Sequence, residues 1–225
     1  MKDPEYSKFA ALLKEETRNK FVKVLLEEKI LDFKSLYAQH LQISETNARH
    51  HMKLLLEIEI IQKEKQQGTK AMFLKINPRY VERARKYFNT EQQFIYLGMA
   101  GETNPGEQIA NAHNQTIKNN WKIEATYIFT TVETIKKLKG SKGWTTLNKQ
   151  VANIHLVPVP LLEFEATYST MKNIIESQIQ QTSIIADVTG LTKIHTLALY
   201  ILAKEFGLTR IYLPKDESNQ IILLP

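Results

Sequence analysis

The chain has 225 residues, of which 43% are apolar and 24% are charged, and none is cysteine. This composition is typical of a globular protein, and it excludes disulfides, thiolate zinc sites and cysteine nucleophiles. The sequence has neither the apolar core of a signal peptide nor a run of about 18 apolar residues, so we expect a cytoplasmic protein without membrane contact.

The positive charge is unevenly distributed along the chain. Residues 1–91 contain 18 Lys and Arg against 13 Asp and Glu, whereas residues 92–225 contain 12 against 11. A basic module joined to a nearly neutral one predicts a polyanionic partner for the basic module. Charge alone is equally compatible with a solvated basic surface that has no partner.

The first part of the chain is predicted to consist of helices followed by a hairpin. Helical periodicity predicts one long helix over 8–28. Asp32 and Ser44 are typical N-caps of a short second helix and of a third helix that ends near Glu59. Two strand-like runs, 60–65 and 71–76, flank a turn at 67–69. We expect an N-terminal domain over 1–78, a linker helix over 79–91 and a C-terminal domain over 92–225.

Strands and helices alternate in the second part of the chain. The expected strands are 94–97, 125–130, 154–159, 183–188 and 210–213, with an edge strand at 220–224. The expected helices are 107–119, a short one ending at Leu138, 165–181 and 192–206, with an exposed turn at 140–143. This alternation predicts an α/β domain with a parallel sheet covered on both faces.

The third predicted helix has the pattern of a DNA-recognition helix. Its apolar positions recur at steps of three and four residues and are expected to pack inward: Ala48, Met52, Leu55 and Ile58. The remaining positions would face outward, where they can enter a major groove: Thr46, Asn47, Arg49, His50 and Lys53. Arg and Asn are the side chains that bond guanine and adenine edges bidentately. Lys65 and Lys70 flank the hairpin tip and would reach phosphates.

Residues 18–78 resemble the winged helix-turn-helix of the ArsR/MarR-like regulators. His51-Met52 matches their frequent His-Leu pair, and Leu55 matches the Leu three residues further on. Glu59 departs from the family, which usually turns on Gly at this point. The resemblance implies binding to double-stranded DNA. No metal site is carried over, because the metal-binding cysteines are absent. The alternative is a winged helix used only for protein contacts or dimerisation.

Two glycine-containing loops follow predicted strands of the second part. The first is 98–106 and the second is 187–193, and both would lie at the carboxyl edge of a parallel sheet, where such folds bind ligands. Amides at a helix N-terminus attract anions, and Lys193 adds a positive charge, so the pattern predicts a phosphate-bearing ligand. The P-loop lysine and the dinucleotide G-x-G-x-x-G are absent, and no histidine cluster with metal spacing is present.

The run Asp-Val-Thr-Gly-Leu-Thr-Lys at 187–193 resembles the D-x-T-G-G-T-K signature of CRISPR-associated Rossmann fold (CARF) domains, and the resemblance extends over 92–215. Leu191 replaces the second glycine of that signature. The resemblance implies a homodimer that binds a cyclic tetra- or hexa-adenylate across its two-fold axis. The ligand contacts that it implies, with Thr130 and Thr131 as weaker candidates, are Gly98, Met99, Ala100, Gly101, Thr103, Asn104, Thr189, Gly190, Leu191, Thr192 and Lys193. Asp187 is expected to order its loop, because it would repel an anion.

Together the two resemblances imply a homodimeric DNA-binding transcription regulator of CRISPR defence. Its effector would be a cyclic oligoadenylate, with the cyclic tetra-adenylate as first choice and no further cofactor. One alternative is a metal-independent ring nuclease that cleaves this ligand, with Lys193 and Thr192 as the candidate catalytic residues. Others are a winged-helix regulator that senses another nucleotide, and a Rossmann-like domain that serves only dimerisation.

Overall fold

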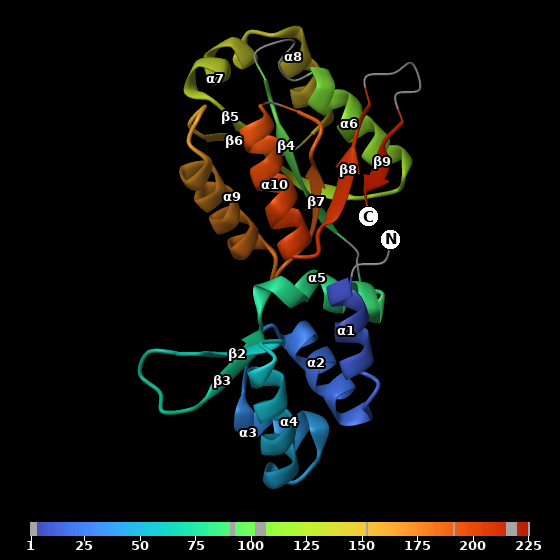
Figure 1. The fold of residues 1–225 in the computed structure, drawn as a ribbon, viewed down its shortest axis with the longest axis vertical. Coiled ribbons are helices and arrows are strands. Elements are labelled where there is room, and N and C mark those ends of the chain that lie inside the picture. The colour runs from blue at the N-terminus through green and yellow to red at the C-terminus, as the bar shows by residue number, and fades with distance from the viewer. Residues whose placement is uncertain are drawn as a thin grey trace. The chain divides into compact units, whose positions relative to one another are not determined.

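The computed structural model describes residues 4–90, 93–101, 107–151, 153–190, 192–214 and 220–224. The chain divides into two compact units, Met1–Thr90 and Glu91–Pro225 (Figure 1). Each unit has its own sheet and its own buried apolar core, so each is described separately.

The first unit combines helices with a small antiparallel sheet. Strand β3 (Phe73–Ile76) lies between β2 (Ile61–Glu64) and the two-residue β1 (Leu31–Asp32). Ile61 pairs with Ile76 and Leu31 with Leu74, both antiparallel. The helices are α1 (Pro4–Leu12), α2 (Glu16–Glu28), α3 (Phe33–Ser35), the π-helical η1 (Leu36–Leu41), α4 (Glu45–Glu57) and α5 (Pro78–Phe88). The predicted hairpin is confirmed, with Gly68 of its turn at φ 80°.

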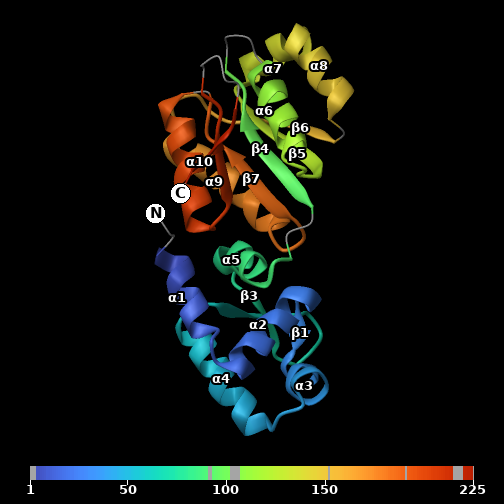
Figure 2. The same cartoon turned by 90° about the vertical axis from the view of Figure 1, so that its right-hand side faces the viewer.

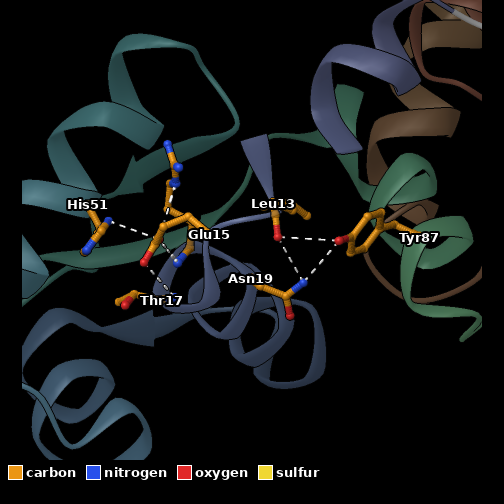
Figure 3. Close-up of polar contacts among 7 residues, drawn as sticks. Leu13, Glu15, Thr17, Asn19, His51 and Tyr87 are labelled. Atoms are coloured by element: carbon orange, nitrogen blue, oxygen red, sulfur yellow. Dashed lines mark hydrogen bonds and ion pairs between the residues drawn. The ribbon is translucent and has the colours of Figure 1, made fainter. Parts of the chain in front are cut away.

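The single helix predicted over 8–28 is wrong, because the chain turns between α1 and α2 (Figure 3). The Glu15 carboxylate accepts the backbone N–H groups of Thr17 (3.1 Å) and Arg18 (2.8 Å) and so caps α2. The Asn19 amide donates to the Leu13 carbonyl oxygen at 3.2 Å, which satisfies that carbonyl. The apolar periodicity of the sequence continues through the break because both helices bury apolar side chains, among them Phe9 and Phe21. It therefore did not reveal the cap.

The predicted N-caps of α3 and α4 are confirmed. The Ser35 N–H donates to Asp32 Oδ1 at 3.0 Å, and the Asn47 N–H donates to Ser44 Oγ at 3.3 Å. Helix α4 ends at Glu57, two residues before the predicted end. Glu59 then adopts φ 58°, in the left-handed region that favours glycine. The turn for which the ArsR/MarR-like family uses Gly is thus made here by a residue with a Cβ.

The second unit is a six-stranded sheet with helices on both faces. Its strands are β4 (Phe94–Met99), β5 (Ile123–Thr130), β6 (Ile154–Pro158), β7 (Ser183–Asp187), β8 (Thr209–Tyr212) and β9 (Ile222–Leu224). The spatial order is β6-β5-β4-β7-β8-β9, with only β9 antiparallel to its neighbour. The predicted parallel sheet is confirmed, and the order of its first five strands is that of doubly wound Rossmann folds.

The helices of this unit form two layers. One face of the sheet carries α9 (Phe164–Gln178) and α10 (Lys193–Glu205); the other carries α6 (Glu107–Lys118), α7 (Val132–Lys139) and α8 (Lys142–Gln150) (Figure 2). The exposed turn predicted at 140–143 is wrong in part. Gly140 ends α7, and Ser141 caps α8 by accepting the Trp144 N–H at 3.1 Å. The glycines and serine there mark a helix-to-helix junction.

Candidate functional site

The two glycine loops meet where the strand order of the sheet reverses. Strands β4 and β7 are neighbours in the sheet but are separated in sequence, and helices leave them toward opposite faces. Doubly wound folds bind ligands in the crevice at such a point, beyond the carboxyl ends of the strands. A Cβ on Gly190 would lie only 2.9 Å from the Met99 carbonyl oxygen and 3.7 Å from Gln108 Oε1. Gly190 therefore allows the segment after β7 to touch the end of β4.

Gly98 serves a different purpose on β4. A Cβ there would lie 2.5 Å from Cε1 of the Tyr96 ring, two residues earlier on the same face of the strand. The bare backbone at Gly98 makes room for this ring, and the fully buried Tyr96 hydroxyl donates to Asp187 Oδ2. Burial raises the pKa of Tyr96 well above its usual value, so the hydroxyl keeps its proton.

Asp187 orders the loop after β7. Its carboxylate accepts the Tyr96 hydroxyl, the Thr189 hydroxyl and the Thr189 N–H, the last at 2.9 Å. Burial raises the pKa of Asp187, and the three hydrogen bonds oppose that rise. Thr189 Oγ1 also accepts the Leu213 N–H at 2.7 Å, which ties this loop to the end of β8. These contacts assign Asp187 and Thr189 to the loop's internal structure.

The two threonines at the end of β5 are bound within the protein. Thr130 is fully buried and donates to the Ala100 carbonyl oxygen at 2.8 Å, while Thr131 caps α7 by accepting the Thr134 N–H at 3.2 Å. Thr131 also lines a cavity of about 550 Å³ with Val132, Glu133 and residues 158–161. The Glu133 carboxylate makes that cavity unfavourable for a phosphate.

Thr192 begins α10 and is connected to the end of β6 through a histidine. Thr192 Oγ1 lies 2.5 Å from His195 Nδ1, and His195 Nε2 lies 3.0 Å from the Pro160 carbonyl oxygen. The ring is fully buried, and burial lowers the pKa of His195 below its usual 6.5. Lys193 is exposed beside it. A second cavity, of about 360 Å³, is lined by Thr192, Lys193, Thr196, Leu197 and Tyr200.

These contacts connect the carboxyl ends of all five parallel strands. We call them the strand-end rim: Thr130 to Ala100, Tyr96 to Asp187, Thr189 to Leu213, and His195 to Pro160. Of the predicted ligand residues, the structure brings Met99 against Gly190 and Ala100 against Thr130. Thr192 and Lys193 lie together at the start of α10 and line one cavity. Thr103, Asn104 and Leu191 lie outside the described residues.

The sequence analysis missed Tyr96 and His195 as parts of this region. Tyr96 stands two residues before Gly98, on the same face of a predicted strand, and this spacing was the available signal. Nothing in the local sequence of His195 indicates its contact with Pro160, which is 35 residues away.

The predicted DNA-binding side chains are all exposed in the first unit. Five lie on α4 and two on the segment between β2 and β3, as the sequence analysis expected: Thr46, Asn47, Arg49, His50 and Lys53, with Lys65 and Lys70. Ala48, Met52 and Leu55 are buried as expected, and Ile58 is partly exposed. Contact of these residues with DNA remains a prediction.

Arg49 is held in place by two neighbours. Its Nε and Nη2 atoms donate to Glu45 Oε1 at 2.7 and 2.5 Å, and its guanidinium lies over the Phe33 ring, 5.3 Å from the ring centroid. The Tyr37 hydroxyl donates to the other Glu45 oxygen at 3.4 Å. An exposed ion pair of this kind contributes less than about 1 kcal/mol to stability. It therefore orients the Arg49 side chain but can be broken easily when the guanidinium binds another group.

His51 connects α4 to the cap of α2 and is not exposed like the residues predicted to bind DNA (Figure 3). Its Nδ1 lies 3.5 Å from Glu15 Oε2, and its side chain is 12% exposed. Burial lowers the pKa of His51, and the Glu15 carboxylate opposes this effect. Burial would raise the pKa of Glu15, but the N–H groups of Arg18 and Thr17 outweigh it and lower that pKa. His51 therefore packs within the first unit.

Two absences concern only the part of the chain that the structure describes. There, no three His, Asp or Glu side chains come together as metal ligands. Among the same residues, no helix has the length and apolar character needed to cross a bilayer.

No protein-family model and no curated protein matches the sequence. The likeness to solved structures is partial, as three of them illustrate. They are Can2 from Sulfobacillus thermosulfidooxidans in complex with cyclic tetra-adenylate (16% identity, TM-score 0.47), VC1899 from Vibrio cholerae (10%, 0.47) and Enterococcus italicus Csm6 bound to cyclic hexa-2'-fluoro-hexa-dAMP (14%, 0.42). The matches cover 59%, 58% and 56% of this chain, but only 35%, 33% and 35% of those chains. TM-scores below 0.5 do not establish a shared fold.

Proposed function

We propose that this protein is a homodimeric, DNA-binding transcription regulator whose C-terminal unit binds a cyclic oligoadenylate. The proposal rests above all on the contact between Gly190 and the Met99 carbonyl, which joins two loops at the switch point of a parallel sheet. In such folds this is the place where nucleotides bind.

The chemistry of the second unit favours an anionic nucleotide. Helix α10 begins beside the switch point, and the partial positive charge of its first turn attracts phosphate. Lys193 adds a full positive charge at the same place and lines the cavity with Thr192 and Tyr200. The ligand class, a cyclic tetra-adenylate first, is the one implied by the resemblance of residues 187–193 to the CARF signature.

A cyclic ligand with rotational symmetry fits a two-fold dimer. Large apolar side chains remain exposed on the second unit, including Leu162 (76%), Leu197 (51%) and Ile201 (38%). Apolar side chains of this size favour burial against a partner. Leu197 lines the same cavity as Lys193, so a second copy of the chain packed there would cover the ligand.

The first unit is proposed to be a winged helix-turn-helix. Helix α4 has an exposed polar face above a buried apolar one, and the hairpin β2–β3 carries exposed lysines at its tip. The excess of Lys and Arg in residues 1–91 matches a DNA partner. In a two-fold dimer, two such helices would read the half-sites of a pseudo-palindrome. Ligand and DNA affinities would be linked, each changing the other by the same factor.

Two binding experiments test the proposal. Calorimetric titration with cyclic tetra-adenylate should show binding that weakens about tenfold or more in Lys193→Ala. The matched control is Lys172→Ala, a partly exposed α9 lysine that pairs with Glu176. For DNA, a salt titration on a mixed-sequence duplex should lose a slope of about 0.9 for each of Lys65→Ala and Lys70→Ala. Arg49→Ala should abolish preference for duplexes selected from a random-sequence library.

The Thr192–His195 contact also supports the ring-nuclease alternative. A hydroxyl bonded to a buried imidazole, which is itself oriented by a carbonyl, is the arrangement of an activated oxygen. Incubation with labelled cyclic tetra-adenylate separates the two functions. Linear product that disappears in Lys193→Ala identifies a nuclease, and intact bound ligand identifies a sensor. A regulator of another nucleotide is indicated if no cyclic oligoadenylate binds.

A further inference from the structure

The first two turns of α10 place two threonine hydroxyls against one cavity. Thr192 and Thr196 are four residues apart, so they lie on the same face of the helix, one turn from each other. Both line the cavity of about 360 Å³ with Lys193, Leu197 and Tyr200. The Tyr200 ring is backed by the Arg210 guanidinium, 5.4 Å from the ring centroid. The residues that line the cavity thus include two threonines, one lysine and one tyrosine.

The direction of the Thr192 hydroxyl is fixed by His195. A backbone carbonyl only accepts hydrogen bonds, so His195 Nε2, 3.0 Å from the Pro160 oxygen, must carry a proton. The ring is fully buried, and burial lowers the pKa of His195, so the ring is neutral at pH 7 and Nδ1 is an acceptor. At 2.5 Å from Nδ1, Thr192 Oγ1 is therefore the donor.

The Thr196 hydroxyl also donates its proton to an acceptor within the protein. Its Oγ1 donates to the Gly190 carbonyl oxygen at 2.8 Å. A hydroxyl has one proton and two lone pairs. Thr192 uses one lone pair weakly for the His195 N–H at 3.5 Å. Both hydroxyls thus donate their single proton to an acceptor within the protein, and only their lone pairs remain available to a ligand.

We propose that Thr192 and Thr196 are specificity-determining acceptors, which require a hydrogen-bond donor on the ligand, and that Lys193 takes the ligand's anionic group. The inference rests on the proposed ligand site. In a cyclic oligoadenylate the donors are the ribose 2′-hydroxyls and the adenine amino groups. Phosphate oxygens are acceptors, so lone pairs on the two threonines repel them. Of the two neighbouring ligand candidates Thr192 and Lys193, only Lys193 is therefore assigned to a phosphate.

The polarity of Thr192 is tested without any ligand. In the full-length protein with ¹⁵N-labelled histidine, NMR at neutral pH should show His195 with its proton on Nε2 and an unprotonated Nδ1. Thr192→Val should shift the Nδ1 resonance, while Thr170→Val, an α9 threonine that bonds the Ala166 carbonyl, should not. A proton on Nδ1, or a charged ring, overturns the inference.

The donor requirement is tested by titration with three probes. These are cyclic tetra-adenylate, its 2′-deoxy analogue and an analogue with purine bases that lack the amino group. The wild type should bind at least one analogue about tenfold more weakly than the parent. The analogue that weakens identifies the ligand donor as the sugar hydroxyl or the base amino group. Equal affinity for all three probes overturns the donor requirement.

Two variants then assign that requirement to the threonines. The double variant Thr192→Val/Thr196→Val should bind the parent about tenfold more weakly and no longer discriminate against the analogue. His195→Gln keeps a donor toward Pro160 but frees the Thr192 hydroxyl to turn, so it should reduce discrimination while Thr170→Val preserves it. Full discrimination in the double variant contradicts the assignment. If no cyclic probe binds the wild type, the proposed function fails, and the NMR result alone decides the polarity of Thr192.

Discussion

The substitution Gly190→Ala tests the contact between the two glycine loops. The new Cβ would lie 2.9 Å from the Met99 carbonyl oxygen, whereas ordinary contacts begin at 3.4 Å. The loops must therefore separate by about half an ångström at the end of β4, which pairs with strands on both sides. Overpacking of this kind costs about 1–3 kcal/mol. Gly190 has no positive φ, so the cost is steric and not conformational.

Gly140→Ala is the matched control in the same unit. Its Cβ would meet only the Lys137 carbonyl oxygen, at 3.9 Å, and its φ is −94°. Because alanine fits this position without strain, Gly140→Ala should stabilise the protein by about 0.4–1 kcal/mol. The gain arises because alanine lowers the conformational entropy of the unfolded chain. The same entropic gain applies to Gly190→Ala, so the difference between the two variants isolates the clash.

Tryptophan fluorescence measures this difference selectively, because Trp121 and Trp144 are the only tryptophans of the chain and both belong to the second unit. Urea unfolding should place Gly190→Ala about 1–3 kcal/mol below Gly140→Ala. That gap corresponds to roughly 4–12 °C in melting temperature for a domain of this size. Equal stabilities of the two variants would refute the close approach and, with it, the way the site is built.

Three further predictions concern groups whose environment is unfavourable. Both ring nitrogens of His113 are buried without a hydrogen-bond partner among the described residues, so His113→Leu should raise the unfolding free energy by about 1–3 kcal/mol. Burial lowers the pKa of His113 below its usual 6.5, so the unfolded chain takes up the proton first on acidification. The advantage of His113→Leu should therefore grow as the pH falls below about 6.5, and an advantage independent of pH between about 8 and 5.5 contradicts this assignment. Glu59→Gly should stabilise the first unit by about 0.5–1 kcal/mol in calorimetry. A residue with a Cβ at φ 58° is strained by about 1–2 kcal/mol, and glycine removes this strain. The greater conformational entropy of glycine in the unfolded chain offsets part of the gain. A lower melting temperature of Glu59→Gly would show that the glutamate side chain itself stabilises the turn.

Local signals predicted most of the secondary structure. Ser44 and Asp32 cap helices through contacts that span only three residues, so they can be seen in a short stretch of sequence. The alternation of strands and helices predicted the parallel sheet, and strand ends in such a sheet share one edge. This is why two loops about 90 residues apart were expected together, and Gly190 lies against Met99 as a result.

Some of the missed features depend on contacts between distant residues. Helix α1 stops before Leu13, whose carbonyl oxygen accepts hydrogen bonds from the Asn19 amide and from the Tyr87 hydroxyl. Tyr87 lies 74 residues further along the chain. His195 orients Thr192 only because Pro160 is next to it in space. Periodicity and capping patterns carry no information on such pairs.

The strand-end rim also has a consequence for the entropy of ligand binding. Its side chains are already held by hydrogen bonds in the folded protein, including Tyr96 on Asp187 and His195 on Pro160. Ordering a free side chain on binding costs about 0.5–1.5 kcal/mol. Side chains that are already ordered in the folded protein do not add this cost to the free energy of binding. Removing a rim contact that is made inside the protein, such as that of the buried Thr130 hydroxyl with Ala100, should therefore weaken the proposed binding through a less favourable entropy. In the proposed function, stability and affinity would share the same bonds at this edge of the sheet, so we expect a variant there to change both.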